Sequence, residues 1–322
     1  MPNNEKIFAI APMLDWTDRH FRFLVRLLTR EALLFTEMIT SPAIIHGDRE
    51  RLLGFDEVEH KIAVQIAGSN PSELAQATKI CADYGYDEID LNVGCPSDRV
   101  QSGSFGACLM AKPDLVAESV SAMVNASDKP VSVKCRIGID EQDIEQALDI
   151  LCDKIIEAGV SKIYVHARKA WLQGLSPKEN RTIPELNYDR VYRLKQRLKG
   201  FPIIINGGIE TLEQSKEHLS YVDGVMLGRA AYHNTMILSE VDQQIFGKTT
   251  PIISQNEIEK QMLNYIENEL VKGTKLNQIT RHMLGLAMGQ RGAKSFRRIL
   301  TLDISKEGAG TNTVEKAFSA LY

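Results

Sequence analysis

A cysteine on a glycine-rich segment has the clearest chemical potential in this sequence. Cys95 lies in NVGCPSDRVQSGSFGACLM, where glycine and serine predict a loop directly after an apolar run. A thiol on such a loop can donate a proton to a bound substrate. Cys108 lies later in the same loop and is the competing donor, although we favour Cys95. The other cysteines fall within expected helices or strands, where we interpret them as small buried apolar groups: Cys81, Cys135 and Cys152.

A lysine within an apolar strand pattern offers a second reactive group. Lys134 lies in VSVKCR, so we expect its ammonium to project into the interior of the fold rather than into open water. Such a lysine can form a Schiff base if burial depresses its pKa, or it can act as a fixed cation that stabilises an electron-rich ring. A structural ion pair with Glu37 or Asp90 is the alternative that the sequence leaves open.

Two further polar residues end strand-like runs. His166 closes KIYVHAR and can serve as an acid, a base, a metal ligand or a hydrogen-bond donor. No second histidine stands at a spacing typical of metal ligands, so we predict no metal site and favour the donor role. Gln65 offers both a donor and an acceptor, which suits the recognition of an imide edge.

Short β-rich runs alternate with segments of helical periodicity, the pattern of an α/β fold with a parallel sheet wrapped by helices. Eight strands are expected, the number that closes a (β/α)8 TIM barrel, at residues 8–13, 33–37, 62–67, 88–92, 131–136, 162–166, 203–206 and 225–228. In such barrels the active site lies at the carboxyl ends of the strands, where these polar residues fall. A doubly wound open sheet is the competing fold.

Glycine turns follow the seventh and eighth expected strands. Asn206, Gly207 and Gly208 lie in INGGI, and Gly228 and Arg229 lie in LGRA, the second before a candidate short helix. Exposed backbone N–H groups and a helix amino terminus at these two strands are where barrels commonly bind phosphate. A tight turn alone also explains a double glycine, so the phosphate interpretation depends on the pairing of the two motifs.

The chain length suggests a second domain, because 322 residues exceed a barrel of roughly 250 residues. The helices expected between the strands cover residues 17–28, 71–84, 113–124, 144–158, 188–198 and 212–219. Beyond about Thr250 the strand pattern disappears, and helices are expected at 257–272, 276–288 and 293–302. We therefore predict a TIM-barrel catalytic domain over 1–246 and an all-helical domain over 247–322.

The composition is that of a globular enzyme, with 43% hydrophobic and 25% charged residues. A net charge of -4 argues against nucleic-acid binding over the whole surface but allows local basic patches. Two such clusters occur, and a solvated helix face is the alternative for each: Arg168, Lys169, Lys178 and Arg181; and Arg291, Lys294, Arg297 and Arg298. The spacing in the second cluster predicts Arg291, Lys294 and Arg298 on one helix face.

The sequence lacks several features that are typical of membrane and secreted proteins. No apolar run approaches the roughly 20 residues needed to cross a bilayer, and MPNNEKIFAI lacks a secretory pattern. The five cysteines include no CxxC pair, which predicts neither a disulfide framework nor a structural zinc site. We expect a cytoplasmic protein without a membrane or an obligate protein partner, and a monomer because no heptad seam is evident.

Taken together, these motifs resemble the tRNA-dihydrouridine synthase family, in particular its bacterial DusA-type subfamily. The resemblance runs over nearly the whole chain and includes APMLDWTD, TEM, QIAG, NVGCPS with SGSFGACLM, VSVKCRIG, VHARKAWLQGLSPKENR, NGGI and LGRA. It implies an FMN-bound barrel and a helical tRNA-binding domain that reduce uridine in the D-loop of tRNA, at positions 20 and 20a, with NADPH as the reductant. One departure is Glu185 in RTIPELNY, where related sequences often carry a second proline, which leaves the path of that loop open.

The resemblance also implies roles for individual residues. Cys95 protonates C5 of the uracil while hydride reaches C6, and Asn92 lies beside it. The implied flavin contacts are Pro12 and Met13 as lining, Gln65, Lys134 and His166 at the ring and ribityl side, and Asn206, Gly207, Gly208, Gly228 and Arg229 at the phosphate. The implied tRNA contacts are Lys178, Arg181, Lys294 and Arg297.

Three other functions remain open at this point. A flavin enzyme acting on a free pyrimidine, such as a dihydroorotate dehydrogenase, shares the barrel and the cysteine but does not need the basic tail. A Schiff-base aldolase using Lys134 needs no flavin. An RNA-binding module without catalysis leaves the polar strand ends unexplained. No GxGxxG motif follows a strand, so we expect NADPH to enter the same mouth as the uridine in a ping-pong cycle.

Overall fold

The computed structural model describes residues 6–97 and 103–321 and contains a barrel of eight parallel strands. The strands are β1 Ile7–Ile10, β2 Leu34–Thr40, β3 Ile62–Ala67, β4 Glu88–Val93, β5 Val131–Arg136, β6 Lys162–His166, β7 Ile203–Asn206 and β8 Gly224–Leu227. They are ordered β1-β8-β7-β6-β5-β4-β3-β2. A parallel bridge between Ala9 and Leu33 joins β1 to β2, so the sheet closes on itself.

The predicted TIM barrel is confirmed, and the doubly wound sheet is wrong. Most strand bounds agree with the prediction within one or two residues, and β3, β5, β6 and β7 agree at both ends. Strand β1 ends at Ile10, before the predicted Met13, because Pro12 has no N–H for a ladder and the chain then turns through Met13 to Thr17. Strand β2 continues to Thr40 through a register shift between Phe35 and Met38.

The alternation of side chains along each strand produces two apolar layers. Residues on one face fill the barrel interior as a small cluster: Ala9, Ala11, Leu33, Phe35, Ala63, Tyr164, Ile204 and Met226. Residues on the other face are mostly valine, isoleucine and leucine, and they belong to the larger core shared with the helices. The interior cluster contains no side chain that is charged at neutral pH. Candidate catalytic and ligand-binding groups are therefore the polar residues at the strand ends.

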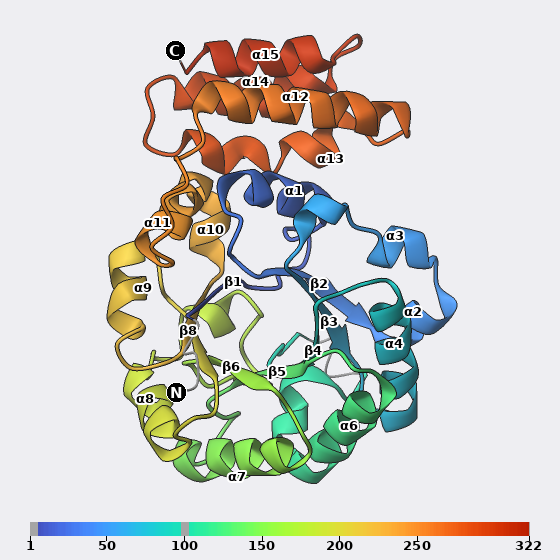
Figure 1. Ribbon diagram of the computed structural model, residues 1–322, viewed down its shortest axis with the longest axis vertical. Helices are drawn as coiled ribbons and strands as arrows, with labels where there is room; N and C mark the ends of the chain where they lie inside the picture. The colour runs from blue at the N-terminus through green and yellow to red at the C-terminus, as the bar shows by residue number, and fades with distance from the viewer. Residues whose placement is uncertain (1–5, 98–102, 322) are drawn as a thin grey trace.

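Helices surround the strands, as Figure 1 shows. The helices between strands are α1 Arg19–Leu28, α2 Ser41–His46, α3 Arg49–Leu53, α4 Pro71–Asp83, α6 Pro113–Ala126, α7 Ile144–Glu157, α8 Tyr188–Arg197 and α9 Leu212–His218. The predicted start of α4 is confirmed, since Asn70 accepts from the backbone N–H groups of Ser72 and Glu73 and Pro71 occupies the first turn. The short helices α2 and α3 were not predicted, because five- and six-residue helices carry little periodicity.

The segment after β8 is entirely helical in the described residues. The helices are α10 Arg229–His233, α11 Val241–Gln244, α12 Gln255–Val271, α13 Leu276–Thr280, α14 Ala293–Leu302 and α15 Thr311–Ser319. Figure 1 shows α12 to α15 stacked at one end of the barrel, beyond α1 and α10. No helix in the described ranges is long and apolar enough to span a bilayer.

One prediction for this segment is wrong, and one helix was not predicted. The single helix expected over 276–288 is divided into α13 and a 3-10 helix, Met283–Ala287, and α15 was not predicted. The division follows from a close approach to the barrel domain. A Cβ atom at Gly285 would lie 2.3 Å from both Thr235 Oγ1 and the Tyr232 carbonyl oxygen. A side chain at this position is excluded, and the backbone conforms to the surface beneath it.

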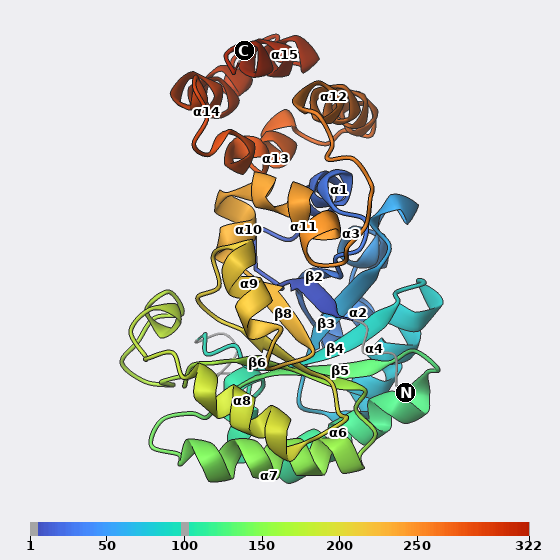
Figure 2. The same ribbon diagram turned by 60° about the vertical axis from the view of Figure 1, so that its left-hand side comes forward.

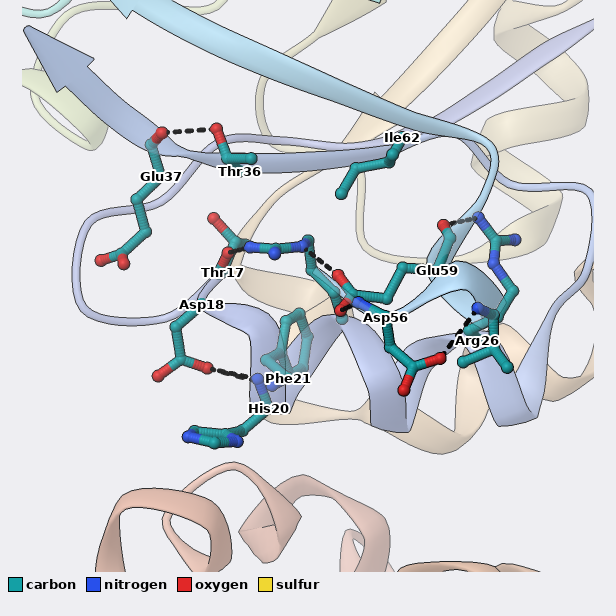
Figure 3. A network of polar contacts seen from close by, with 12 residues as sticks. Thr17, Asp18, His20, Phe21, Arg26, Thr36, Glu37, Asp56, Glu59 and Ile62 are labelled. Atoms are coloured by element: carbon teal, nitrogen blue, oxygen red, sulfur yellow. Dashed lines mark hydrogen bonds and ion pairs between the residues drawn. The ribbon is translucent and has the colours of Figure 1, made fainter. Parts of the chain in front are cut away.

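Polar and aromatic contacts join α1 to the C-terminal helices. The ring of His20 lies 2.7 Å from the hydroxyl of Tyr265, which also stacks on Phe23 with ring centroids 3.9 Å apart. Asp18 caps α1 and also pairs with Arg281 and His282. Burial alone would raise the pKa of Asp18, but hydrogen bonds and charge from these partners hold it well below its usual range. Figure 3 shows Asp18 and His20 on the side of α1 that faces these helices.

Candidate active site at the carboxyl ends of the strands

Polar residues of five adjacent strands meet at the mouth of the barrel. The parallel registers pair Gln65 with Asp90, Asn92 with Lys134, and His166 with Asn206. These residues therefore lie at similar heights around the carboxyl end, where a ligand can contact all of them. Asn206 is held by a bond from its Nδ2 to the Met226 carbonyl oxygen on the next strand, at 2.7 Å.

A directed chain of hydrogen bonds fixes two of these side chains. Asp90 is fully buried and accepts from Ser132 Oγ at 3.0 Å and from Gln65 Nε2 at 2.7 Å. Gln65 Oε1 in turn accepts from Asn92 Nδ2 at 2.7 Å. Asn92 Oδ1 accepts from the backbone N–H of Cys95 at 3.0 Å and from that of the preceding glycine. Because a carboxylate only accepts, Asp90 sets the orientation of both amides and, through them, the start of the cysteine loop.

Lys134 enters the mouth without a structural ion pair. Among the described residues, no carboxylate forms an ion pair with its ammonium. Burial lowers the pKa of Lys134, the charge of Arg136 lowers it further, and Asp90 opposes the shift. Burial likewise raises the pKa of Asp90. The predicted ion-pair alternative with Glu37 or Asp90 is wrong, so this lysine is available to a ligand.

His166 is a neutral imidazole at ordinary pH. Burial lowers its pKa well below 6.5, and the charges of Arg136, Lys134, Arg168 and Arg229 act in the same direction. Its ring packs directly on Gly207, where a Cβ atom would lie 2.6 Å from the imidazole Cδ2. Gly207 also has a φ of +117°, so a side chain there is excluded twice. A neutral ring can donate or accept one hydrogen bond without adding charge.

The opposite side of the mouth carries cations and glycine backbone. Gly228 precedes α10, and a Cβ atom there would meet only Ala11 Cβ and Met13 Sδ, both at 3.8 Å. Arg229 begins α10 and donates to the Arg181 carbonyl oxygen at 3.3 Å. The Nε of Arg168 is buried and has no hydrogen-bond partner in the described part of the chain. Because Arg168 Nη1 already donates to the Pro184 carbonyl oxygen, the unpaired Nε is the donor that this residue can offer to an anionic ligand.

Cys95 faces this charged mouth, whereas its competitor does not. Cys95 is half-buried, its sulfur lies 3.5 Å from Ser97 Oγ, and the carbonyl oxygen of the preceding Gly94 accepts from Arg136 Nε at 2.9 Å. Cys108 instead directs its thiol to the Phe105 carbonyl oxygen at 3.0 Å, and burial raises its pKa. The other three cysteines are buried, as predicted: Cys81, Cys135 and Cys152. The geometry therefore favours Cys95 as the proton donor.

The loop after β6 is folded around one buried residue that the sequence analysis missed. Asn180 exchanges hydrogen bonds with both backbone groups of Trp171 at 2.8 Å and donates to the Leu175 carbonyl oxygen at 3.1 Å. This closes the loop, so that the two cations predicted to bind tRNA project from its surface: Lys178 and Arg181. Their position is therefore fixed by the fold of the loop.

The second basic cluster lies on and before α14. Lys294 is exposed, Arg297 is half-buried, and neither forms an ion pair with a described residue, whereas Arg298 pairs with Asp303 at 3.4 Å. The predicted helical face is wrong for Arg291, because Gly292 adopts a left-handed conformation and α14 begins only at Ala293. Figure 2 shows α14 and the yellow-green loop after β6 on the same side of the molecule.

The fold and the site define a class of protein: a (β/α)8-barrel enzyme whose mouth combines a half-buried thiol, that of Cys95, with several cationic side chains. In the described residues, no group of three or more histidine, cysteine, aspartate or glutamate side chains could hold a metal ion. The dihydrouridine synthase (Dus) family profile matches residues 9–321. The chain belongs to the dihydrouridine synthase family and is an oxidoreductase.

Similar sequences cover almost the entire chain. A tRNA-dihydrouridine(20/20a) synthase of Shewanella oneidensis is 53% identical over 319 residues, which is 99% of this chain and 95% of that protein. The protein of the same name from Synechocystis is 54% identical and spans 97% of this chain and 93% of its own length. That of Vibrio cholerae is 52% identical and spans 97% and 96%.

Solved structures support the fold alone. An old yellow enzyme homologue from Zymomonas mobilis superposes with a TM-score of 0.54 at 11% identity, covering 79% of this chain and 92% of that chain. Morphinone reductase gives a TM-score of 0.53 at 11% identity, with 79% and 88% covered. Both covered fractions leave out about a fifth of this chain, as expected if the neighbours share chiefly the barrel.

Proposed function

We propose that this protein reduces uridine to dihydrouridine in the D-loop of tRNA, at positions 20 and 20a, with bound FMN and with NADPH as the reductant. The observation that carries the proposal is the hydrogen bond of the Cys95 backbone N–H to Asn92, a residue in register with Lys134, because it places the cysteine loop at the barrel mouth next to that lysine. The relatives named as tRNA-dihydrouridine(20/20a) synthases, at 52 to 54% identity, support the same reaction and the same positions.

The residues at the mouth fit FMN. Lys134 would offer an unpaired ammonium to the bound ring, and the neutral imidazole of His166 would offer a donor for a ring carbonyl. The Nε of Arg168 supports this fit, because it is a buried donor without a hydrogen-bond partner among the described residues and can donate to a ligand oxygen. In our assignment Pro12 and Met13 line the ring, Gln65 contacts its edge, and the phosphate is held by Asn206, Gly207, Gly208, Gly228 and Arg229.

The protein's own part in the reaction is orientation and proton transfer. Reduced FMN, when bound, supplies hydride to C6 of the uracil. Cys95 donates its proton to C5, so that a thiolate remains on the sulfur. Asn92 already uses its oxygen and one N–H within the hydrogen-bond chain, so it presents only an N–H donor to the base. This donor suits a uracil carbonyl, because a carbonyl oxygen accepts.

A uridine must leave its stack to reach this mouth, so we assign tRNA binding to surfaces around it. Lys178 and Arg181 belong to the loop after β6, and Lys294 and Arg297 belong to α14, which lies on the same side of the molecule as that loop. We place the tRNA-binding domain in the helices after about Gly247. Because the proposed substrate is tRNA, we expect the protein to act in the cytoplasm, and to act as a monomer.

The deciding experiment uses undermodified tRNA. The holoenzyme is incubated with this tRNA and NADPH, and the digested product is examined for dihydrouridine by mass. We expect the added mass at positions 20 and 20a. Flavin reduction without dihydrouridine in tRNA, together with turnover of a free pyrimidine, would instead establish the dihydroorotate-type reaction. A colourless protein that forms a borohydride-trapped adduct at Lys134 would establish the aldolase.

Removal of the α14 cations is expected to weaken tRNA binding without affecting the flavin. The double variant Lys294→Ala with Arg297→Ala removes two unpaired cations, so the slope of log Kd against log salt should become shallower by about 1 to 2. Filter binding at several salt concentrations measures this slope. Arg298→Ala is the matched control, because Arg298 already pairs with Asp303, at 3.4 Å. An equal effect of the control would contradict the assignment.

A further inference from the structure

A buried arginine at the mouth has only backbone partners. Arg136 is the last residue of β5 and is 3% exposed. Its Nε donates to the Gly94 carbonyl oxygen, and its Nη1 donates to those of Lys169 and Asn180, each at 2.9 Å. It forms no ion pair with a carboxylate of the described residues. Its charge is therefore not neutralised by any direct partner in this part of the chain.

The carbonyl partners belong to the two loops that the proposed reaction requires. Gly94 directly precedes Cys95, whereas Lys169 and Asn180 lie in the loop after β6 and Asn180 directly precedes Arg181. One planar side chain thus holds the loop of the proton donor at a fixed separation from the loop that borders the substrate entrance. Asn180, one of the residues whose carbonyl oxygen accepts from Arg136, is itself fully buried, and its side chain is hydrogen-bonded.

A second arginine provides a comparison within the same barrel. Arg26 is also buried and donates to backbone carbonyls, those of Thr29, Ala32, Glu59 and Lys61. It lies at the opposite end of the barrel, where α1 leads into β2, and Figure 3 shows it beside Glu59. Burial lowers the pKa of both arginines to about 10.

The charged surroundings of the two arginines differ. Around Arg26, attraction comes from carboxylates, chiefly Asp242 and Glu59. Around Arg136, attraction comes from Cys95, which follows the glycine whose carbonyl oxygen accepts from Arg136 Nε at 2.9 Å, while Arg181 and Arg168 repel it. A cation kept in the interior by backbone bonds alone, next to the loop of the proton donor, is suited to stabilise negative charge that forms on that sulfur.

We propose that Arg136 is a positioning residue for proton donation, which fixes the Cys95 loop against the β6 loop and holds a positive charge toward the Cys95 sulfur. The inference rests on the proposed function. As the S–H bond breaks and the new C–H bond forms at C5, the electron pair of the S–H bond stays on sulfur, and Arg136 stabilises the resulting thiolate. Water returns a proton to the sulfur before the next turnover.

The charge is tested without tRNA, by alkylating Cys95 of the holoenzyme with iodoacetamide across a range of pH. The background is Cys108→Ala, so that Cys95 is the accessible thiol, and mass spectrometry locates the label. In Arg136→Gln we expect the midpoint of the alkylation profile to move to higher pH, because the thiolate loses a nearby cation. In Arg26→Gln the midpoint should not move. An unchanged midpoint in Arg136→Gln overturns the charge role.

The positioning is tested with Arg136→Lys, which keeps the charge but cannot satisfy three carbonyls in two loops. We expect an unchanged alkylation midpoint, and a fall of about 10- to 100-fold in kcat for uridine reduction, because the donor is misplaced. Reduction of the flavin by NADPH should be unaffected. Wild-type kcat overturns the positioning role. If Arg136→Gln yields no folded holoenzyme, the kcat of Arg136→Lys decides whether Arg136 positions the Cys95 loop.

The two proposals can fail separately. If wild-type protein makes no dihydrouridine in tRNA, the proposed function fails, while the alkylation profile still reports whether Arg136 acts on Cys95. If wild-type protein makes dihydrouridine and the Arg136 variants match it in both measurements, only the inference about Arg136 fails. Thermal unfolding of each holoenzyme variant shows whether a loss of activity reflects a loss of folded protein.

Discussion

Replacement of the thiol in Cys95→Ala should reduce kcat for uridine reduction by about 10²- to 10⁴-fold, the usual contribution of a positioned general acid. The loop should keep its place, because Asn92 binds the backbone N–H of residue 95 rather than its side chain. Flavin content and the rate of flavin reduction by NADPH should therefore remain close to those of the unchanged protein. Stopped-flow measurement of the two half-reactions separates the effects.

Cys108→Ala is the matched control, since the two thiols lie on the same segment of the chain. Cys108 is bonded to the Phe105 carbonyl oxygen, and burial raises its pKa, so its removal should leave kcat within about twofold. A Cys108→Ala variant that loses turnover while Cys95→Ala retains it would reverse the assignment. Equal losses in both would indicate that the loop, and not a particular thiol, is required.

The fold was readable from the sequence because its signals are local. The apolar composition of runs such as VSVKCR and KIYVHAR predicts buried strands. Once a strand has been predicted, the residues at its carboxyl end are also known. The right-handed connection between parallel strands then leaves few topologies. For the same reason the polar strand ends Gln65, Lys134 and His166 could be identified as one group before any distance was known.

The parts that the sequence did not reveal depend on contacts between distant segments. Arg136 donates to carbonyl oxygens 42 and 44 residues away in the sequence. Every residue has a backbone carbonyl, so the residue types in the sequence do not indicate which one accepts. Asp90 was recognised only as a possible ion-pair partner, although it orients Gln65 through a hydrogen bond. The break between α13 and the following 3-10 helix depends on Gly285 lying against Thr235.

Capping and helix length explain the remaining differences. The helix α14 begins at Ala293 because Gly292 has a φ of +76°, which a helical periodicity over 291–298 cannot indicate. The helix α15 was missed because a glycine precedes it rather than a residue that favours a helix start. The start of α4, by contrast, was predicted correctly from Asn70 and Pro71, because a helix cap is a local sequence signal.

Replacement of the mouth cation in Lys134→Met should slow flavin reduction by NADPH by about 10²- to 10³-fold, comparable to the loss of one oriented charge-stabilising group. The variant should also have a lower flavin midpoint potential, because the reduced ring is the more anionic form and loses its cation. Potentiometric titration followed by absorbance measures the potential. A potential that does not fall would contradict a ring contact for Lys134.

The pH dependence has a definite sign. Burial lowers the pKa of Lys134 below its ordinary value of 10.5, so the ammonium loses its proton earlier as the pH rises. The charged form is the one that stabilises the ring, hence the wild-type rate of flavin reduction should decline on the alkaline side, well before pH 10.5. Lys134→Met should lack this decline.

Lys162→Met is the matched control for this lysine, since Lys162 lies on the neighbouring strand β6 at its amino end. Its ammonium is paired with Glu88 at 2.7 Å, so its removal leaves a carboxylate that is only 3% exposed without its cation. This should lower the free energy of unfolding by roughly 3 kcal/mol, while the flavin potential and its pH dependence stay unchanged. The contrast assigns one interior lysine to stability and the other to the electrostatics of the mouth.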